Sequence, residues 1–536
     1  MSDERTAGYS RFDLEQTPPR VTVPRLYNAA VDLVERNLSE GRGENIAVID
    51  DQGRYSYREL AGRVDRCGNA LLALGLQAEQ RVAMLLHDSV DFPTVFFGAV
   101  KAGLVAVPVN TLLTADDYAY MLADSRARAL VVSAALLPVV APILDSLPQL
   151  EHVIVSGPAG PNGDNDGYPR LAELLAAASD KLEPAATTAD DVAFWLYSSG
   201  STGRPKGAAH LQSDLIHTAV YYGMAVLGIG AGDVVFSAAK LFFAYGLGNA
   251  MTFPLSVGAT AVLMAGRPTP ESVMQRLREH RATIFFGVPT LYAGILADDG
   301  IGREASSDRL RICVSAGEAL PEEVARRWSE RFGVEIADGI GSTEMLHIFL
   351  SNRPGDIRYG STGKAVPGYE CRLLDDAGQE VADGEIGDLL VSGPSSAPWY
   401  WNNREKSLAT FEGRWTRTGD KYLRDADGYY IYAGRSDDML KVGGIWVSPF
   451  EVESALMAHD KVLEAAVVGQ MDENDLVKPK ATVVLKQGGG SPELASELQQ
   501  FVKSRLAPYK YPRWIEFAEE LPKTATGKIQ RFKLRD

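Results

Sequence analysis

Residues 197–207 read Tyr-Ser-Ser-Gly-Ser-Thr-Gly-Arg-Pro-Lys-Gly, a run that combines small hydroxyl residues, glycines and two cations. Glycine lets backbone N–H groups turn toward an anion with no Cβ in the way, while Arg204 and Lys206 add positive charge. The run follows the apolar, strand-like residues 192–196, which argues against a flexible surface linker. We predict a phosphate-binding loop formed by Ser198, Ser199, Gly200, Ser201, Thr202, Gly203 and Lys206.

A second group of polar residues follows a short strand signal at residues 334–337. Residues 338–344 read Asp-Gly-Ile-Gly-Ser-Thr-Glu, and the two glycines allow a flat ligand to approach the backbone. The Thr343 hydroxyl suits a phosphate, and the Glu344 carboxylate offers the hard oxygen that suits a magnesium ion bridging phosphates. The alternative is an ordinary turn with a solvated glutamate.

Three further motifs lie downstream. Asp420, in a Thr-Gly-Asp sequence expected to form a turn, can hold both hydroxyls of a ribose. Arg435, in the run Gly-Arg-Ser-Asp-Asp at residues 434–438, can reach a ribose or a phosphate unless the run is a solvated linker. Near the end of the chain, the tight-turn pair Thr526-Gly527 would hold Lys528 in one place, which a basic tail would not need.

The elements that must position these residues alternate in type. Strand-like and helix-like segments follow one another from residue 46 to residue 155, which favours parallel sheets covered by helices. Glycines, turns and short alternating runs become frequent after about residue 355 and predict a β-rich subdomain. A last unit of about 100 residues reads as a small α+β domain. The sequence thus predicts an α/β protein.

The composition narrows the class of protein. A chain of 536 residues suits two or three domains, and its net charge of −16 disfavours nonspecific nucleic-acid binding. The three cysteines are far apart, so no zinc site or disulfide framework is indicated, and a reducing cytoplasm fits. Residues 241–266 carry no formal charge, but glycines and a proline interrupt them, so we expect a buried helix, a turn and a strand instead of a membrane span. No signal peptide is expected at the polar N-terminus.

The five motifs occur in an order that resembles the adenylate-forming superfamily of acyl-CoA synthetases, adenylation domains and luciferases, over nearly the whole chain. Within it the chain most resembles the aryl-CoA ligases that act on benzoate, through residues 26–33, 240–249 and 345–349. The resemblance implies a large N-terminal domain, residues 1–434, whose β-rich, barrel-like subdomain spans about 355–434. It also implies a small mobile C-terminal lid, residues 435–536, that rotates about a hinge at Asp437.

The reaction that the resemblance implies has two halves. A carboxylate first attacks the α-phosphate of ATP, giving an acyl-adenylate and pyrophosphate, and the thiol of coenzyme A then displaces AMP. Catalysis would be mainly positioning and charge stabilisation by Lys528, Thr343 and Glu344. Lys528 is assigned to the α-phosphate and carboxylate, Arg204 and Lys206 to the β- and γ-phosphates, and Glu344 with Thr202 to Mg²⁺.

The resemblance also implies which residues contact the adenine, the ribose and coenzyme A. Ile340 stands where the family usually has an aromatic residue stacked on adenine, so that stacking is in doubt. Asp420 and Arg435 would hold the ribose. The adenine edge is expected at Gly317, Glu318, Ala319, Asp338, Gly339 and Ile340, and the pantetheine arm of coenzyme A at Lys441, Gly443, Gly444 and Trp446.

The acyl pocket is the least constrained part. Residues 234–270 hold no Asp or Glu, and an amino-acid substrate would need a carboxylate for its ammonium group. Bulky side chains in this segment and after Glu344 favour a short flat acid over a long fatty acid, although about half of them are expected only to pack a core. His347 either hydrogen-bonds a ring substituent or is satisfied in the wall. Substrate contacts are predicted at Ala238, Phe243, Ala244, Tyr245, Gly246, Gly341, His347 and Ile348.

Other functions remain open at this point. A ligase for a hydroxybenzoate, an aminobenzoate or a short-chain acid would share every nucleotide residue. A non-catalytic nucleotide-binding protein on the same fold is disfavoured by the presence of Lys528, Glu344 and Asp420. Acetylation of Lys528 by a lysine acetyltransferase, reversed by a deacetylase, would remove its charge and is expected to stop adenylation. We expect no nucleic-acid or membrane partner, and a monomer or a homodimer.

Overall fold

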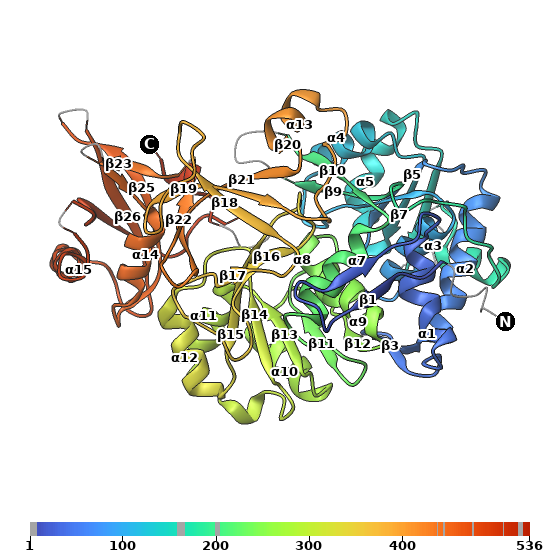
Figure 1. The fold of residues 1–536 in the computed structure, drawn as a ribbon, viewed down its shortest axis with the longest axis horizontal. Helices are drawn as coiled ribbons and strands as arrows, with labels where there is room; N and C mark the ends of the chain where they lie inside the picture. Colours follow the sequence, from blue (N-terminus) through green and yellow to red (C-terminus); the bar gives the residue numbers. More distant parts are fainter. Residues whose placement is uncertain are drawn as a thin grey trace.

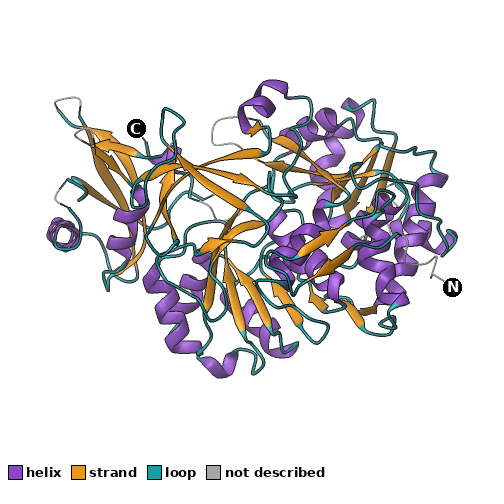
Figure 2. Cartoon of the chain, in the orientation of Figure 1, coloured by secondary structure: helices purple, strands orange, loops and turns teal. Residues whose placement is uncertain are grey.

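The structure, a computed structural model, has the C-terminal unit at one end of the molecule and the first helices at the other (Figure 1). Helices cover the strands of two large sheets, and a β-rich region lies between these sheets and the C-terminal unit (Figure 2). This arrangement confirms the predicted α/β class. The structure describes residues 8–157, 167–198, 204–436, 438–442, 445–473, 476–507, 509–523 and 529–535.

Six strands form the first large sheet, in the order β10-β9-β6-β5-β7-β8. Neighbouring strands are parallel except for the hairpin of β9 and β10, which flanks the predicted phosphate loop. The parallel strands are almost wholly apolar and buried, as expected for a sheet covered on both faces. The strands are β5 (Arg81–Leu85), β6 (Val105–Pro108), β7 (Ala129–Ser133), β8 (His152–Ser156), β9 (Val192–Ser198) and β10 (Lys206–Leu211).

Two of the helices around this sheet begin at reciprocal side-chain caps. The Ser56 side chain accepts from the backbone N–H of Glu59 and the Glu59 side chain accepts from Ser56, a reciprocal cap that starts α2. Thr114 and Asp117 cap α4 in the same way. The helices are α2 (Tyr57–Ala73), α3 (Asp91–Lys101), α4 (Ala115–Ser125), α5 (Leu137–Val140) and α6 (Leu171–Ala177).

Nine strands form the second large sheet, in the order β17-β16-β15-β14-β13-β11-β12-β3-β4. Its six central strands are parallel and its two edges are antiparallel. Strand β15 continues to Gly341, so the predicted turn at residues 338–344 begins only after the strand ends. The strands are β3 (Ile46–Ile49), β4 (Arg54–Ser56), β11 (Val234–Ser237), β12 (Thr260–Val262), β13 (Ile284–Gly287), β14 (Ile312–Ser315), β15 (Ile336–Gly341), β16 (Ile348–Ser351) and β17 (Lys364–Ala365).

Helices cover both faces of the second sheet. The uncharged segment forms α8 (Ala244–Leu247), the π-helix η6 (Gly248–Thr252) and α9 (Phe253–Val257) before β12, so the expected helix, turn and buried strand are present. In the part of the chain that the structure describes, no helix has the length and apolar character to span a bilayer. The other helices are η2 (Val31–Glu35), α1 (Arg36–Ser39), α7 (Asp214–Thr218), η5 (Ala219–Met224), α10 (Pro270–Glu279), α11 (Pro289–Ala297) and α12 (Glu322–Phe332).

The β-rich region is a five-stranded antiparallel sheet with one short helix. The Thr-Gly-Asp motif lies inside β21 and not in a separate turn. Asp420 pairs with Arg435 of β22, whereas the pairing of β21 with β19 is interrupted between Arg417 and Lys421. Gly419 has φ of +76° there, next to a shift in strand register. The elements are β18 (Glu370–Leu374), β19 (Ile386–Ser392), α13 (Arg404–Thr410), β20 (Phe411–Glu412), β21 (Trp415–Arg424) and β22 (Tyr430–Arg435).

The last unit is a three-stranded sheet, β25-β26-β27, packed against two helices and joined to β22 through a small hairpin. Ser448 and Ser491 cap its helices, as their positions before Pro449 and Pro492 favour. The elements are β23 (Leu440–Val442), β24 (Ile445–Val447), α14 (Pro449–Met457), β25 (Val462–Met471), β26 (Val477–Leu485), α15 (Pro492–Lys503), β27 (Trp514–Ala518) and the 3₁₀ turn η8 (Arg531–Leu534). Short strands β1 (Arg11–Asp13) and β2 (Arg20–Thr22) and the 3₁₀ turns η3 (Ala134–Leu136), η4 (Ala141–Ser146) and η7 (Arg303–Ala305) complete the chain.

Gly363 joins the second large sheet to the β-rich region. Its carbonyl accepts from the Tyr430 N–H at 2.8 Å, and the Tyr430 carbonyl accepts from the Thr362 N–H at 2.8 Å. Gly363 has φ of +80°, and a Cβ there would lie 2.1 Å from the carbonyl carbon and oxygen of Ser351. Only glycine therefore fits this junction without a backbone shift.

We expect Gly363→Ala to lower the free energy of unfolding by roughly 3 kcal/mol or more, because backbone strain and a backbone clash add together. Gly378→Ala is the matched control, since Gly378 has φ of +77° and an added Cβ would meet nothing within 4 Å. The control should cost only about 1–2 kcal/mol, the penalty of a left-handed residue with a side chain. Thermal unfolding of both variants measures the difference, and equal losses would contradict the close approach.

Candidate active site

The predicted site residues lie where parallel strands of the two large sheets end. Strand β9 ends at Ser198, β14 at Ser315 and β15 at Gly341. Ligands of open α/β sheets bind in the crevice outside the carboxyl ends of the strands. The hydrogen bond between Ser198 and Glu344 brings these ends of the two sheets together, although the two residues are 146 positions apart in sequence.

Three predicted phosphate residues meet at this edge. The Ser198 hydroxyl donates to Oε1 of Glu344 at 3.2 Å, and Ser198 pairs with Lys206 across the β9–β10 hairpin. Burial lowers the pKa of Lys206, and the nearby Glu344 carboxylate partly offsets that shift by favouring the charged ammonium. A carboxylate and a half-buried cation thus lie together at the base of the predicted loop. Arg204 lies above the Tyr120 ring, 5.0 Å from its centroid.

Tyr400 is a site residue that the sequence reasoning missed. Its hydroxyl donates to Oε1 of Glu344 at 2.7 Å, and the Lys206 ammonium lies 5.1 Å from its ring centroid. Burial first, and the Glu344 charge second, raise the pKa of Tyr400, so its hydroxyl keeps its proton and remains a donor. The aromatic run Trp-Tyr-Trp at residues 399–401 was the available signal.

The turn that carries Thr343 and Glu344 is held from outside at three successive carbonyl oxygens. Leu346, at its end, has φ of +67°, an unfavourable conformation for a residue with a branched side chain. The surroundings must therefore stabilise this turn. The donors to the carbonyls of Thr343, Glu344 and Met345 are, in that order, the His210 ring at 2.8 Å, the Ala397 N–H at 2.7 Å and the Ser395 hydroxyl at 2.7 Å.

The predicted adenine edge combines a buried carboxylate with exposed backbone. Asp338 is only 7% exposed, and burial raises its pKa well above the usual range. Among the described residues its buried Oδ1 has no hydrogen-bond partner, which leaves an unpaired acceptor in this part of the site. Gly317 has φ of +94°, which turns the backbone of the Gly-Glu-Ala sequence outward. Gly339 lies in β15 beside Ile340, whose partly buried side chain packs on the core.

The predicted ribose residues bind each other. Arg435 donates to Oδ1 of Asp420 at 3.1 Å, and the two residues face each other across β21 and β22. The residues on either side of Asp437 are both anchored. The Ser436 hydroxyl donates to Asp388 at 2.8 Å, whereas Asp438 pairs with Arg535 of the C-terminal unit. A single position between two such anchors is where a hinge would act.

The C-terminal unit contacts the predicted adenine edge. The backbone N–H of Ile529, the residue after Lys528, donates to Oε1 of Glu318 at 3.1 Å. The ring of Phe450 also packs edge-on against Tyr432 of β22, with centroids 5.6 Å apart. In this arrangement the last residues of the chain reach the same edge as Glu344.

Several predicted residues cannot be placed. Lys441 and Trp446 pair with each other in the β23–β24 hairpin, but their side chains lie outside the described part of the structure. The other predicted site residues that lie outside the described ranges are Ser199, Gly200, Ser201, Thr202, Gly203, Asp437, Gly443, Gly444 and Lys528.

The residues predicted to line the acyl pocket come from several elements and pack closely together. Gly246 and Gly341 must stay small, since a Cβ would lie 2.0 Å from the Lys240 carbonyl oxygen and 2.5 Å from the His347 carbonyl oxygen, respectively. The Tyr245 hydroxyl lies 3.2 Å from the carbonyl oxygens of both Gly287 and Val314. Ala238, His347 and Ile348 are buried, whereas Phe243, Ala244 and Tyr245 are partly exposed.

His347 is held within the wall. Its Nε2 lies 3.0 Å from Oδ1 of Asn249 and donates to it, and its ring contacts the rings of Phe253 and Tyr222. Burial lowers the pKa of His347 to about 3, so the ring is neutral near pH 7. In the described part of the chain, Nδ1 of His347 and Nδ2 of Asn249 have no partner. The wall is therefore uncharged but offers polar atoms.

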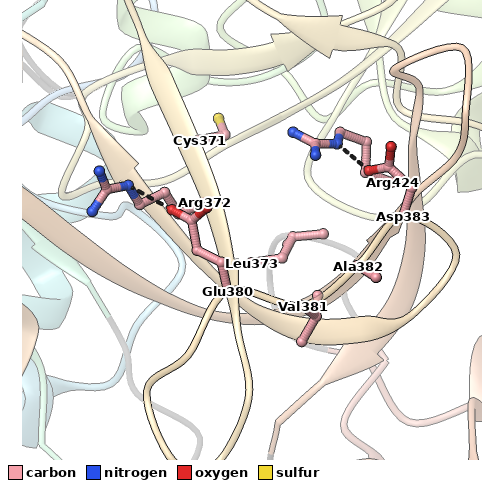
Figure 3. A pocket seen from close by; sticks show the side chains of 8 residues that line it. All are labelled: Cys371, Arg372, Leu373, Glu380, Val381, Ala382, Asp383 and Arg424. Carbon is pink, nitrogen blue, oxygen red and sulfur yellow. Dashed lines mark hydrogen bonds and ion pairs between the residues drawn. The ribbon is translucent and has the colours of Figure 1, made fainter.

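A hollow in the β-rich region can be excluded as the substrate site. Its volume of about 30 Å³ is far below the roughly 300–1,000 Å³ of a typical small-molecule site. Figure 3 shows its two arginines paired with acidic neighbours, Arg372 with Glu380 at 3.0 Å and Arg424 with Asp383 at 2.7 Å. None of the predicted site residues lines it.

Comparison with known proteins agrees with this geometry. The profile of the AMP-binding enzyme family matches residues 34–401, and that of the AMP-binding enzyme C-terminal domain matches residues 451–528. A benzoate–CoA ligase of Thauera aromatica is 62% identical over 98% of both chains. A 4-hydroxybenzoate–CoA/benzoate–CoA ligase of Rhodopseudomonas palustris is 54% identical over 96% of this chain and 94% of its own.

A solved structure agrees as well. An anthranilate CoA ligase in complex with anthranoyl-AMP has a TM-score of 0.92 and 46% identity, over 96% of this chain and 97% of its own. The fold and the site thus define an adenylate-forming enzyme, as the sequence predicted. The chain belongs to the AMP-binding enzyme family.

The neutral state of His347 makes a pH-dependent prediction. Because its pKa falls from 6.5 to about 3 on folding, the unfolded chain takes up a proton below pH 6.5 that the folded chain does not. This contribution to stability is complete above pH 6.5 and is lost as the pH falls toward 3. At about pH 5 the loss should be on the order of 2 kcal/mol.

The variant His347→Gln lacks this titration but keeps an N–H donor for Asn249. Urea unfolding at about pH 7.5 and about pH 5 should show the free-energy difference between wild type and variant shifting by on the order of 2 kcal/mol in favour of the variant at the lower pH. A difference that stays constant between the two pH values would contradict a buried neutral His347.

Proposed function

We propose that this chain is an ATP-dependent aryl-CoA ligase that activates benzoate as benzoyl-AMP, releases pyrophosphate and then forms the coenzyme A thioester. The observation that carries the proposal is the meeting of Ser198, Lys206 and Glu344 at the carboxyl edge of the sheets. This constellation suits a polyphosphate, and the neutral wall beside it suits a flat apolar acid. The identity of 62% with a benzoate–CoA ligase supports the choice of acid.

The first half-reaction needs charge stabilisation at the phosphates. Lys206 and Arg204 would face the β- and γ-phosphates, while Lys528 would bind the α-phosphate and the incoming carboxylate. The Ile529 contact with Glu318 supports this role for Lys528, because it brings the neighbouring residue to the adenine edge. Asp338, whose Oδ1 is unpaired among the described residues, would accept from the adenine amino group, and Asp420 with Arg435 would hold the ribose.

The donor set at Glu344 fits a magnesium ion. Its carboxylate and the Ser198 hydroxyl are hard oxygens, and no cluster of three or more potential ligands occurs among the residues placed by the structure. Mg²⁺ is commonly held by one or two carboxylates together with substrate phosphates, so a single glutamate suffices. Glu344, with Thr202 from the loop, would hold the ion, which would neutralise charge on the phosphates.

The second half-reaction requires the thiol of coenzyme A in place of Lys528. The anchored residues on both sides of Asp437 support a rotation of the C-terminal unit about that position. The β23–β24 hairpin, with Lys441, Gly443, Gly444 and Trp446, would then face the pantetheine arm.

A second candidate function is a ligase for a benzoate that carries a hydroxyl or amino substituent on its ring. Nδ1 of His347 and Nδ2 of Asn249, unpaired among the described residues, could serve a hydroxyl or amino substituent. The related hydroxybenzoate and anthranilate ligases favour such activity as an alternative. A cytoplasmic location, a monomeric or homodimeric state and acetylation of Lys528 stay predictions.

Pyrophosphate release from ATP tests the function directly. Benzoate should give the highest kcat/KM in a panel that also holds hydroxybenzoates, 2-aminobenzoate and short linear acids, and AMP release should then depend on coenzyme A. Preference for a linear acid would overturn the aryl assignment. No release with any acid would favour a non-catalytic nucleotide-binding protein.

Lys528→Ala tests the two-orientation mechanism. Loss of the cation at the α-phosphate should slow benzoyl-AMP formation by at least about 100-fold, since such charge stabilisation is typically worth a few kcal/mol. Thioester formation from supplied benzoyl-AMP should stay within about threefold of wild type, as Lys528 has left the site by then. Equal loss of both half-reactions would contradict a separate orientation for each.

A further inference from the structure

His210 and Asp214 form a buried pair behind the Glu344 turn. Their side chains are 0% and 1% exposed, and Nδ1 of His210 lies 2.9 Å from Oδ2 of Asp214. The His210 ring stacks on Phe194 of β9 with centroids 5.1 Å apart. Its other nitrogen, Nε2, lies 2.8 Å from the carbonyl oxygen of Thr343. The pair thus connects the β10 strand and the start of α7 to a turn more than 120 residues downstream.

The chemistry of these contacts decides where hydrogens must be. The Thr343 carbonyl can only accept, so Nε2 of His210 must carry a hydrogen at 2.8 Å. The contact between Nδ1 and the Asp214 carboxyl group holds a second hydrogen, and Asp214 also accepts from the Leu211 N–H at 3.0 Å. The two side chains together carry two hydrogens and no net charge, which makes their complete burial tolerable.

The bonded carbonyl belongs to the strained turn. The same Thr343 oxygen accepts from the Leu346 N–H at 3.2 Å, and Leu346 is the residue with φ of +67°. Without the His210 bond, that oxygen would rely on the weaker of its two donors. The side chains of Thr343 and Glu344 project from this turn, so its orientation sets where a hydroxyl and a carboxylate face the phosphates.

We propose that Asp214 and His210 are positioning residues that fix the Thr343–Glu344 turn for adenylate formation, an inference that rests on the proposed function. Asp214 holds the imidazole in the form that carries hydrogen on Nε2. His210 then donates this hydrogen to the Thr343 carbonyl and so fixes the backbone of the turn. Neither side chain reaches the substrate, because Asp214 and the turn cover both ring nitrogens.

Conservative variants separate this role from simple packing. In His210→Gln the amide nitrogen can occupy the place of Nε2 and donate to Thr343, so most of the activity should remain. His210→Asn reaches only the place of Nδ1 and loses the donor. Asp214→Asn would accept from Nδ1–H and leave Nε2 without a hydrogen, facing the carbonyl with a lone pair.

The rates of the two half-reactions are the main readout. His210→Asn and Asp214→Asn should slow benzoate-dependent pyrophosphate release about 10- to 100-fold, the value of a hydrogen bond worth about 1.5–3 kcal/mol. They should also raise the Mg²⁺ concentration needed for half the maximal rate. Thioester formation from supplied benzoyl-AMP, which does not use the polyphosphate side, should fall by less than about threefold.

His217, on the same helix as Asp214, provides a matched control. Its ring is mostly buried and stacks on Tyr221, with centroids 5.9 Å apart, instead of facing the turn. His217→Asn should therefore leave both half-reactions near wild type while shifting the unfolding temperature by a similar amount to His210→Asn. If His210→Asn slowed both half-reactions equally, or if His210→Gln were as slow as His210→Asn, the positioning role would be overturned.

An observation independent of activity completes the test. Nitrogen NMR of the histidine-labelled enzyme should show one ring with hydrogen on Nε2 and a strong hydrogen bond at Nδ1, and this signal should vanish in His210→Gln. A ring with hydrogen on Nδ1 alone would overturn the proposal. If wild type released no pyrophosphate with benzoate, the proposed function would fail, and the NMR result would still judge the hydrogen-bonded pair.

Discussion

A strained turn held from outside is the constraint on which the site depends. Leu346 adopts a left-handed conformation, and such residues persist only where the surroundings over-determine them. Here two separate segments donate to three successive carbonyls, one through the His210 ring and the other through the Ala397 N–H and the Ser395 hydroxyl. The side chain of Glu344 can then meet Ser198 and Tyr400 without further ordering. Preorganisation of this kind suits a reaction that needs charge stabilisation more than covalent chemistry.

The same logic extends to the phosphate hairpin. The segment with Tyr400 runs beside β10, since the Trp401 N–H donates to the Gly207 carbonyl at 2.7 Å and the Ala209 N–H donates to the Trp399 carbonyl at 3.1 Å. Rigid strands on both sides therefore fix the ends of the loop at Ser198 and Lys206. The C-terminal unit differs, because its described contacts here include the hydrogen bond of Ile529 to Glu318 and the packing of Phe450 on Tyr432, and no strand pairing with the large sheets. Rigid phosphate contacts and the proposed rotation of the C-terminal unit would be compatible, because they would belong to different units.

The side chains predicted to line the acyl pocket are uncharged. A buried carboxylate or cation beside a flat apolar acid would need a partner, and the wall segment supplies none. His347 fits this rule because burial keeps its ring neutral and Asn249 accepts from it. Glycines let the backbone approach closely at two points of the wall, Gly246 and Gly341. Differences among aryl ligases in the acid they accept would therefore arise from small changes of shape and of unpaired polar atoms here.

The sequence by itself determined the order of the motifs, the alternation of strands and helices and the absence of charge in residues 241–266, because each of these is written in residue types along the chain. The sequence also predicted Glu344 and Lys206 as site residues, because their charges follow from residue type. Only the tertiary structure decided that Tyr400 and His210 belong to the site and that Asp420 lies within a strand, since hydrogen-bond partners come from distant segments. Strand pairing and carbonyl contacts leave no local signature, because any residue supplies the same backbone groups.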